Sequence, residues 1–188
     1  MLTNRRTFFA VLTLAVAALP ARADRPQPSF ETWFPRLNAG VWVKVEGLPR
    51  DGILHATKIK ILATALDESE ISSTIASVDA AARSLQTELG VTVFATHRTD
   101  VQGLDSERIP FASLKPGDRV ESEGQIQRDG SLLADEIDLE RPMHDREVEE
   151  DEITARAESV DPATHRIVLL GVTVQVDAKT RNVTPKLE

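Results

Sequence analysis

Apolar and polar residues alternate along much of the chain, and the alternation is repeated. Val41, Val43 and Val45 alternate with other residues at the period of two that predicts a half-buried β-strand. Asp51-Gly52 then predicts a tight turn, because glycine accepts the positive φ that such turns need. The return strand carries apolar positions at Leu54, Ala56, Ile59 and Ile61. The second copy of the hairpin has Val120, Asp129-Gly130, Leu132, Ala134, Ile137 and Leu139 at the matching positions.

The apolar spacing slips from two to three at one place in both copies, between Ala56 and Ile59 and between Ala134 and Ile137. A slip of this kind predicts a β-bulge, which curls a sheet toward closure. Each hairpin follows a short apolar segment, 34–37 or 111–114, for which we expect a single helical turn that plugs a barrel end.

A second unit is also duplicated and reads as three strands. The predicted strands are 71–78, 85–89 and 91–93 in one copy, and 153–160, 167–170 and 172–176 in the other. The alanine-rich stretch 74–87 resembles a helix, but its copy contains Pro162 and a β-branched run, so we predict strands. Three strands and a hairpin make the five of a small oligonucleotide-binding-type barrel. The expected fold is therefore all-β, with two OB-like barrels built from duplicated units.

The order of the units leaves the pairing open. Residues 70–139 can close one contiguous barrel, which leaves 34–61 and 152–183 to build a second barrel from the two ends of the chain. We favour this arrangement because chain termini usually lie close together. One alternative builds each barrel from neighbouring units, with residues 34–101 in one barrel and 111–183 in the other. Another alternative exchanges strands between two chains in a dimer. The acidic stretch 140–151 is expected to be a linker.

These motifs resemble an exported bacterial family, the domain of unknown function 5666. The resemblance rests on the segments Gly90-Val91-Thr92-Val93, 111–124 and Asp129-Gly130 through Ile137. It covers residues 70–139 as a whole unit and the flanks as half units. The resemblance implies a small β-barrel module in the bacterial envelope, with no catalytic residues to transfer and an open ligand.

The first residues predict an export signal. Arg5 and Arg6 precede an apolar run, Phe8 to Leu19, that is too short for a stable membrane anchor, and 21–23 fit a cleavage site. Asn4-Arg5-Arg6-Thr7-Phe8-Phe9 resembles the twin-arginine motif, although the general secretory route stays open. We expect a periplasmic or secreted protein that starts at residue 24 and has no later membrane span.

Composition removes several function classes. The chain has no cysteine, which excludes disulfides, thiol catalysis and thiolate metal sites. Loss of residues 1–23 removes three arginines and no acid, which changes the formal net charge from −8 to −11. Because this charge repels phosphate, nucleic acid is not an expected partner.

Candidate binding residues lie on the polar sides of the predicted strands. Trp42 and Lys44 share one strand, and Arg119 takes the place of Trp42 in the second copy. An exposed aromatic and two cations of this kind can contact a sugar or a partner side chain, although such an aromatic more often covers a neighbouring element. The candidate metal ligands, Met143, His144, Asp145 and Glu147, lie in the linker, where a hydrated charge run is the simpler interpretation.

No nucleophile elbow, phosphate loop or zinc signature is present in the sequence, so we expect no enzyme and no cofactor. The expected function is a non-enzymatic binding or adaptor protein of the envelope, for a protein or small ligand, as a monomer or strand-exchanged dimer. Metal handling through the linker is the alternative, and a hydrolase is a more distant one.

Overall fold

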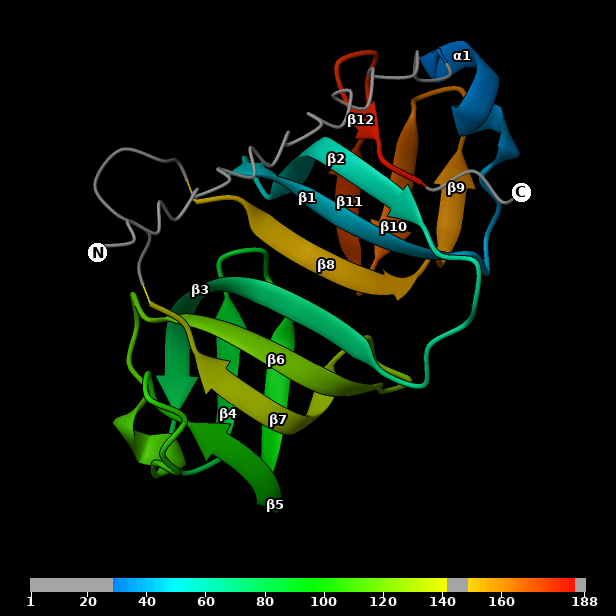
Figure 1. The fold of residues 1–188 in the computed structure, drawn as a ribbon. Coiled ribbons are helices and arrows are strands. Elements are labelled where there is room, and N and C mark those ends of the chain that lie inside the picture. The colour runs from blue at the N-terminus through cyan, green and yellow to red at the C-terminus, as the bar shows by residue number, and fades with distance from the viewer. Residues whose placement is uncertain (1–28, 142–148, 185–188) are drawn as a thin grey trace, which may run out of the picture.

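The structure, a computed structural model, describes residues 29–141 and 149–184. These residues form a 12-stranded sheet with three short helical turns, α1 (Phe30–Trp33), η1 (Phe34–Arg36) and η2 (Phe111–Ser113). The sheet curls into two five-stranded barrels, so the predicted all-β fold of duplicated units is confirmed (Figure 1). Within the described residues, no helix combines the length and hydropathy needed to cross a bilayer.

The central barrel is contiguous in sequence. Its strands are β3 (Ser69–Asp79), β4 (Ser84–Thr87), β5 (Thr92–Gln102), β6 (Arg119–Ile126) and β7 (Leu132–Leu139). The pairing runs β3–β6–β7–β5–β4 and closes because β4 returns to β3. All strand pairings within this barrel are antiparallel, except that β5 and β7 pair in parallel.

The terminal barrel is built from both ends of the described chain. Its strands are β1 (Trp42–Arg50), β2 (Ile53–Ile61), β8 (Asp151–Arg156), β9 (Ser159–Asp161), β10 (Arg166–Leu169) and β11 (Val172–Gln175). The pairing runs β8–β1–β2–β11–β10–β9, and β9 continues the path of β8 after two residues. The two together therefore count as one strand of the five, as their copy β3 does in the central barrel. A short strand, β12 (Arg181–Asn182), also pairs with β2. The blue and red segments thus share the upper barrel of Figure 1, while the green segments form the lower one.

A β-bulge lies at the predicted position in each hairpin. The register shifts where Glu46 faces Lys58 but Gly47 faces Ala56, and the copy shifts between Glu123 and Gly124. The extra residue therefore sits in the return strand, between the apolar positions whose spacing slips. The resulting bend allows one face of each hairpin to stay inside its barrel.

A short helical turn with a buried phenylalanine is duplicated in the two barrels, and we call it the plug. Phe34 and Phe111 are 1% and 3% exposed, and the helical turns around them, η1 and η2, match the prediction. His165 meets the Phe34 ring edge-on at 5.6 Å, and Arg83 lies over the Phe111 ring at 5.3 Å. The helical turn α1, just before Phe34, was not predicted.

Inward residues of both barrels form the core, since they alternate with outward polar residues along each strand. The stretch 74–87 is strand, turn and strand, as predicted. The predicted linker 140–151 overlaps β8, which begins at Asp151. Residues 142–148 of that linker lie outside the described residues.

Candidate functional site

The two barrels are joined by strand pairing between β3 and β8. Ile71 of β3 faces Ile153 of β8, and the flanking pairs are Glu70 with Thr154 and Ser72 with Glu152. Ile71 and Ile153 occupy equivalent positions of the duplicated unit. Their antiparallel pairing therefore creates a local two-fold axis between the barrels. We call this contact the junction.

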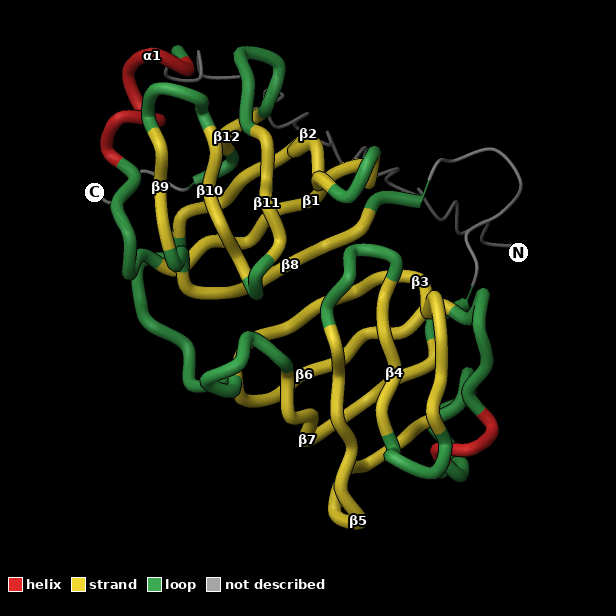
Figure 2. The backbone as a smooth tube through the Cα atoms, turned by 180° about the vertical axis from the view of Figure 1, so that it is seen from behind, coloured by secondary structure: helices red, strands yellow, loops and turns green. Residues whose placement is uncertain are grey.

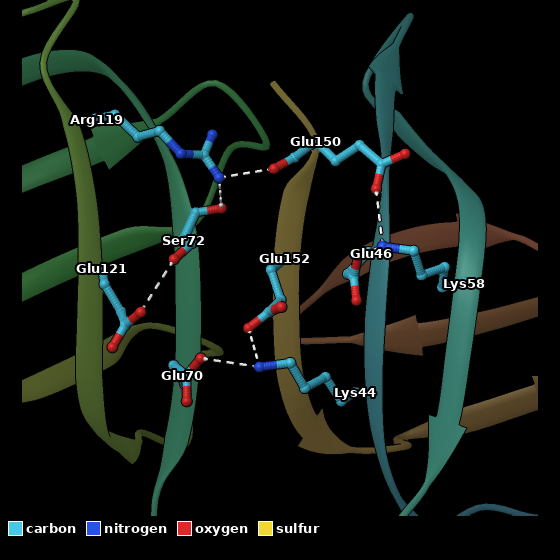
Figure 3. A network of polar contacts seen from close by, with 9 residues as sticks. All are labelled: Lys44, Glu46, Lys58, Glu70, Ser72, Arg119, Glu121, Glu150 and Glu152. Atoms are coloured by element: carbon cyan, nitrogen blue, oxygen red, sulfur yellow. Dashed lines mark hydrogen bonds and ion pairs between the residues drawn. The ribbon is translucent and has the colours of Figure 1, made fainter. Parts of the chain in front are cut away.

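Lys44 extends across the outer face of the junction, where Figure 3 shows its ammonium between two carboxylates. It forms an ion pair with Glu152 of its own barrel, and its Nζ lies 3.8 Å from Glu70 of the central barrel. Partial burial of Glu70 and a hydrogen bond with Glu152 raise the pKa of Glu70 to about 7. Burial lowers the pKa of Lys44, but its hydrogen bond and charge pairing with Glu152 outweigh this effect, so the pKa is raised.

Arg119 forms a second connection at the start of β8. Its guanidinium contacts Asp151 at 2.9 Å and Glu140 at 2.9 Å, and it donates a hydrogen bond to the carbonyl oxygen of Glu150 at 2.7 Å. The Ser73 hydroxyl donates to the other Asp151 oxygen at 2.8 Å. Asp151 is buried, and this burial raises the pKa of its carboxyl despite the two partners. Arg119 and Ser73 thus attach the central barrel to the first residue of β8.

The three predicted binding residues therefore lie at or near the junction. Two of them, Lys44 and Arg119, form ion pairs there. Trp42 lies half-buried on β1, opposite Arg156 of β8. Lys44 and Arg119 bind carboxylates of this chain. These contacts leave their role in ligand binding a prediction.

An acidic band continues from the junction over the outer face of the central barrel. Strand register places Glu123 opposite Glu136, Glu121 opposite Asp138, and Asp100 opposite Glu136. Burial, followed mainly by repulsion from neighbouring carboxylates, raises the pKa of Glu121, Glu123, Glu136 and Asp138. None of the described residues forms a group of three or more acids and histidines arranged to hold a metal ion. Met143, His144, Asp145 and Glu147 lie outside the described residues, so the metal-handling alternative stays a prediction.

A groove separates the barrels on the side of the duplicated turns. Leu89-Gly90-Val91 of the central barrel and Leu170-Gly171-Val172 of the terminal barrel are equivalent turns, and both line a hollow of about 310 Å³. The β4–β5 and β10–β11 turns approach each other in the rear view of Figure 2. Phe94, which is 36% exposed, and Asp129 also line this hollow, on the side of the central barrel.

A second hollow, of about 400 Å³, also has lining residues from both barrels. Ile126 of the central barrel and residues 156–158 of the terminal barrel line it. The Glu158 carboxylate accepts a hydrogen bond from the Gly171 backbone N–H at 2.9 Å, which links the two hollows. We call the two hollows together the inter-barrel groove. The groove was not predicted from the sequence, although the repeated Leu-Gly-Val turns were the available signal.

The comparisons give the family but not an activity. The family described as Domain of unknown function (DUF5666) matches residues 3–60 and 73–138, which is more than half of the chain. The chain belongs to this family. The second match covers most of the central barrel, and the first ends inside β2. No curated protein and no solved structure matched the chain.

Proposed function

We propose that this DUF5666 protein is an exported, non-enzymatic binding or adaptor protein of the bacterial envelope. In this proposal, the inter-barrel groove holds an extended peptide segment of a partner protein. The observation that carries the proposal is the meeting of two equivalent turns, one from each barrel, around a hollow with Phe94 exposed beside it. Concave sites at the interface between two structural units are common places for ligands.

The chemistry of the groove favours a peptide with an apolar residue next to a basic one. Phe94, which is 36% exposed, is the apolar side chain that the first hollow offers to an apolar group, while the leucine and valine residues of the two turns are buried beneath it. Asp129 lies at its side, and hydrogen bonds from Ser131 lower the pKa of that carboxyl, so it is negatively charged at neutral pH. Glu158 adds another carboxylate in the second hollow. These carboxylates attract a basic residue of the peptide, and so does the net charge of −11 on the mature chain.

A non-catalytic role is supported by where the perturbed carboxyls lie. Catalytic acids and bases usually combine a shifted pKa with a position in a cleft. In this chain, the described carboxyls with raised pKa belong to the junction and the acidic band, whereas the groove is lined by other residues. Their shifts have a structural cause, which is burial next to other carboxyls.

A peptide-library selection on the mature protein, residues 24–188, tests the groove. We expect enriched peptides with an apolar residue next to lysine or arginine, and we expect Phe94→Asp to reduce their affinity at least about tenfold, or about 1.4 kcal/mol. Leu104→Asp is the matched control, because Leu104 is 43% exposed and lies outside the groove. Equal loss in both variants, or no enriched motif, contradicts the proposal.

The export part has its own test. N-terminal sequencing of the protein from an envelope fraction should give Asp24 as the first residue. Replacement of Arg5 and Arg6 by lysine should abolish export if the twin-arginine route is used. Protein that keeps residues 1–23 and stays in the cytoplasm would contradict export.

A further inference from the structure

The junction carries more acidic groups than its lysine can balance. Glu70 and Glu152 are equivalent residues that lie one step from the local two-fold axis, on the same face of the joined sheet. Lys44 contacts both of them. The residue equivalent to Lys44 in the second copy is Glu121, so the duplication repeats the acids but not the cation. One ammonium therefore faces three carboxyls.

We propose that the junction is a proton-operated joint, in which a proton shared between Glu70 and Glu152 holds the two barrels in register. Uptake of the proton turns the Glu70 carboxylate into a carboxylic acid that donates a hydrogen bond to the Glu152 carboxylate. Lys44 then balances the single charge that remains on the pair. Loss of the proton to solvent leaves two adjacent carboxylates on strands that belong to different barrels. Their repulsion then opposes the β3–β8 pairing.

Charged groups face Glu70 from each strand that packs against it, and together they favour its protonation. β1 contributes Lys44 and β8 contributes Glu152, while β6 contributes Glu121 and, directly opposite Glu70, Glu123. Ahead of β3, Glu68 interacts with Glu123. Lys44 is the single cation in this set, and its attraction is outweighed by burial and the neighbouring carboxyls. The resulting pKa of about 7 for Glu70 puts the transition near neutral pH.

The joint is short, which makes it sensitive to one charge. Within the described residues, three residue pairs of β3 and β8 are the strand pairing that connects the barrels. Arg119 and Ser73, bound to Asp151, provide a separate connection that requires an ionised Asp151. Burial raises the pKa of Asp151, so strong acid weakens that connection. We therefore expect the tightest joint in weak acid and a looser joint in weak base.

Pulsed electron paramagnetic resonance on the mature protein tests the joint. The chain has no cysteine, so spin labels can be attached to His97→Cys of the central barrel and Ala178→Cys of the terminal barrel, both at exposed positions. The distance distribution should be narrow at about pH 6 and at least about twofold broader at about pH 8.5, because Glu70 loses its proton between them. Glu70→Gln, which keeps a hydrogen-bond donor without the charge, should stay narrow at both pH values.

Asp100→Asn is the matched control, because Asp100 pairs with Arg108 within the central barrel and lies on β5, which pairs with β4 and β7 and not with β3 or β8. The distance distribution of this control should broaden between about pH 6 and about pH 8.5, as that of the unmodified protein does. Carboxyl ¹³C shifts of the unmodified protein provide a second measurement, in which the Glu70 carboxyl should titrate with a midpoint near 7. The proposal is overturned if the distance distributions are the same at both pH values, if that of Glu70→Gln broadens as that of the unmodified protein does, or if the Glu70 carboxyl is ionised by about pH 5.5.

Discussion

Gly124 lies at the bulge of the second hairpin, where the two strands approach too closely for any side chain. A Cβ added at Gly124 would lie 2.1 Å from the Leu133 carbonyl oxygen and 2.8 Å from the Ala134 Cα. The equivalent Gly47 has the same environment, with the His55 carbonyl oxygen at 2.4 Å. Both obstacles are backbone atoms, so no side-chain rotation can relieve the clash. We therefore predict that Gly124→Ala is strongly destabilising.

The magnitude follows from the displacement that the strands must make. A carbon and a carbonyl oxygen rarely approach closer than about 3.3 Å, so β6 and β7 must separate by about 1 Å at the bulge. Overpacking of this kind costs about 3 kcal/mol of the free energy of unfolding. For a chain of this length, that cost lowers Tm by about 6–12 °C. Gly47→Ala should behave in the same way in the other barrel.

Thermal unfolding of the mature protein, followed by circular dichroism, measures the effect. Gly130→Ala is the control, because its added Cβ meets nothing within 4 Å and only the positive φ of 86° opposes the change. That control should lose about 1 kcal/mol, or about 2–4 °C of Tm. If Gly124→Ala lowers Tm no more than Gly130→Ala does, the bulge geometry is wrong.

Three further predictions concern the junction and the plug. Arg119→Met leaves the buried Asp151 carboxylate without its cation and should cost about 3 kcal/mol in urea unfolding, and a loss below about 1 kcal/mol would contradict the pairing. The pKa of Glu70 is about 7 in the folded chain against an ordinary 4.5, so its stabilising contribution is complete below about pH 4.5 and is lost as the pH rises through 7. With solvent screening, we expect a loss of about 1–2 kcal/mol, measured by urea unfolding against pH and absent in Glu70→Gln. Phe34→Ala removes a 1% exposed ring from the plug and should cost about 3–5 kcal/mol in urea unfolding, and a urea midpoint like that of the unmodified protein would contradict the role of the plug.

Local structure was predictable because the duplication records each feature twice. The bulges follow from a spacing slip that both copies share, and Pro162 in one copy excludes a helix from the matching stretch of the other. The plug around Phe34 and Phe111 follows from the same comparison. In each case the determining interactions lie within one hairpin or one turn, so neighbouring residues carry the signal.

The junction was not predictable from the pattern, because strand edges pair through backbone groups that any residue supplies. Alternation places Lys44 and Arg119 on an outer face, but it does not show that the other barrel supplies a carboxylate to each of them. The inter-barrel groove could not be predicted from the sequence for a related reason. The repeated turns around Gly90 and Gly171 are visible in the sequence, but they define a site only after the barrels are placed side by side.

The direct pairing of β3 with β8 joins the two barrels in one sheet, and the junction, the joint and the groove all depend on it. Nuclear Overhauser spectroscopy of the mature protein tests this pairing through backbone contacts between segments far apart in the chain. The structure predicts cross-strand contacts that link Glu70 with Thr154, Ile71 with Ile153 and Ser72 with Glu152. If the barrels are folded and no backbone contact links 69–73 with 151–155, the junction, its proton-operated joint and the groove beside it are contradicted together.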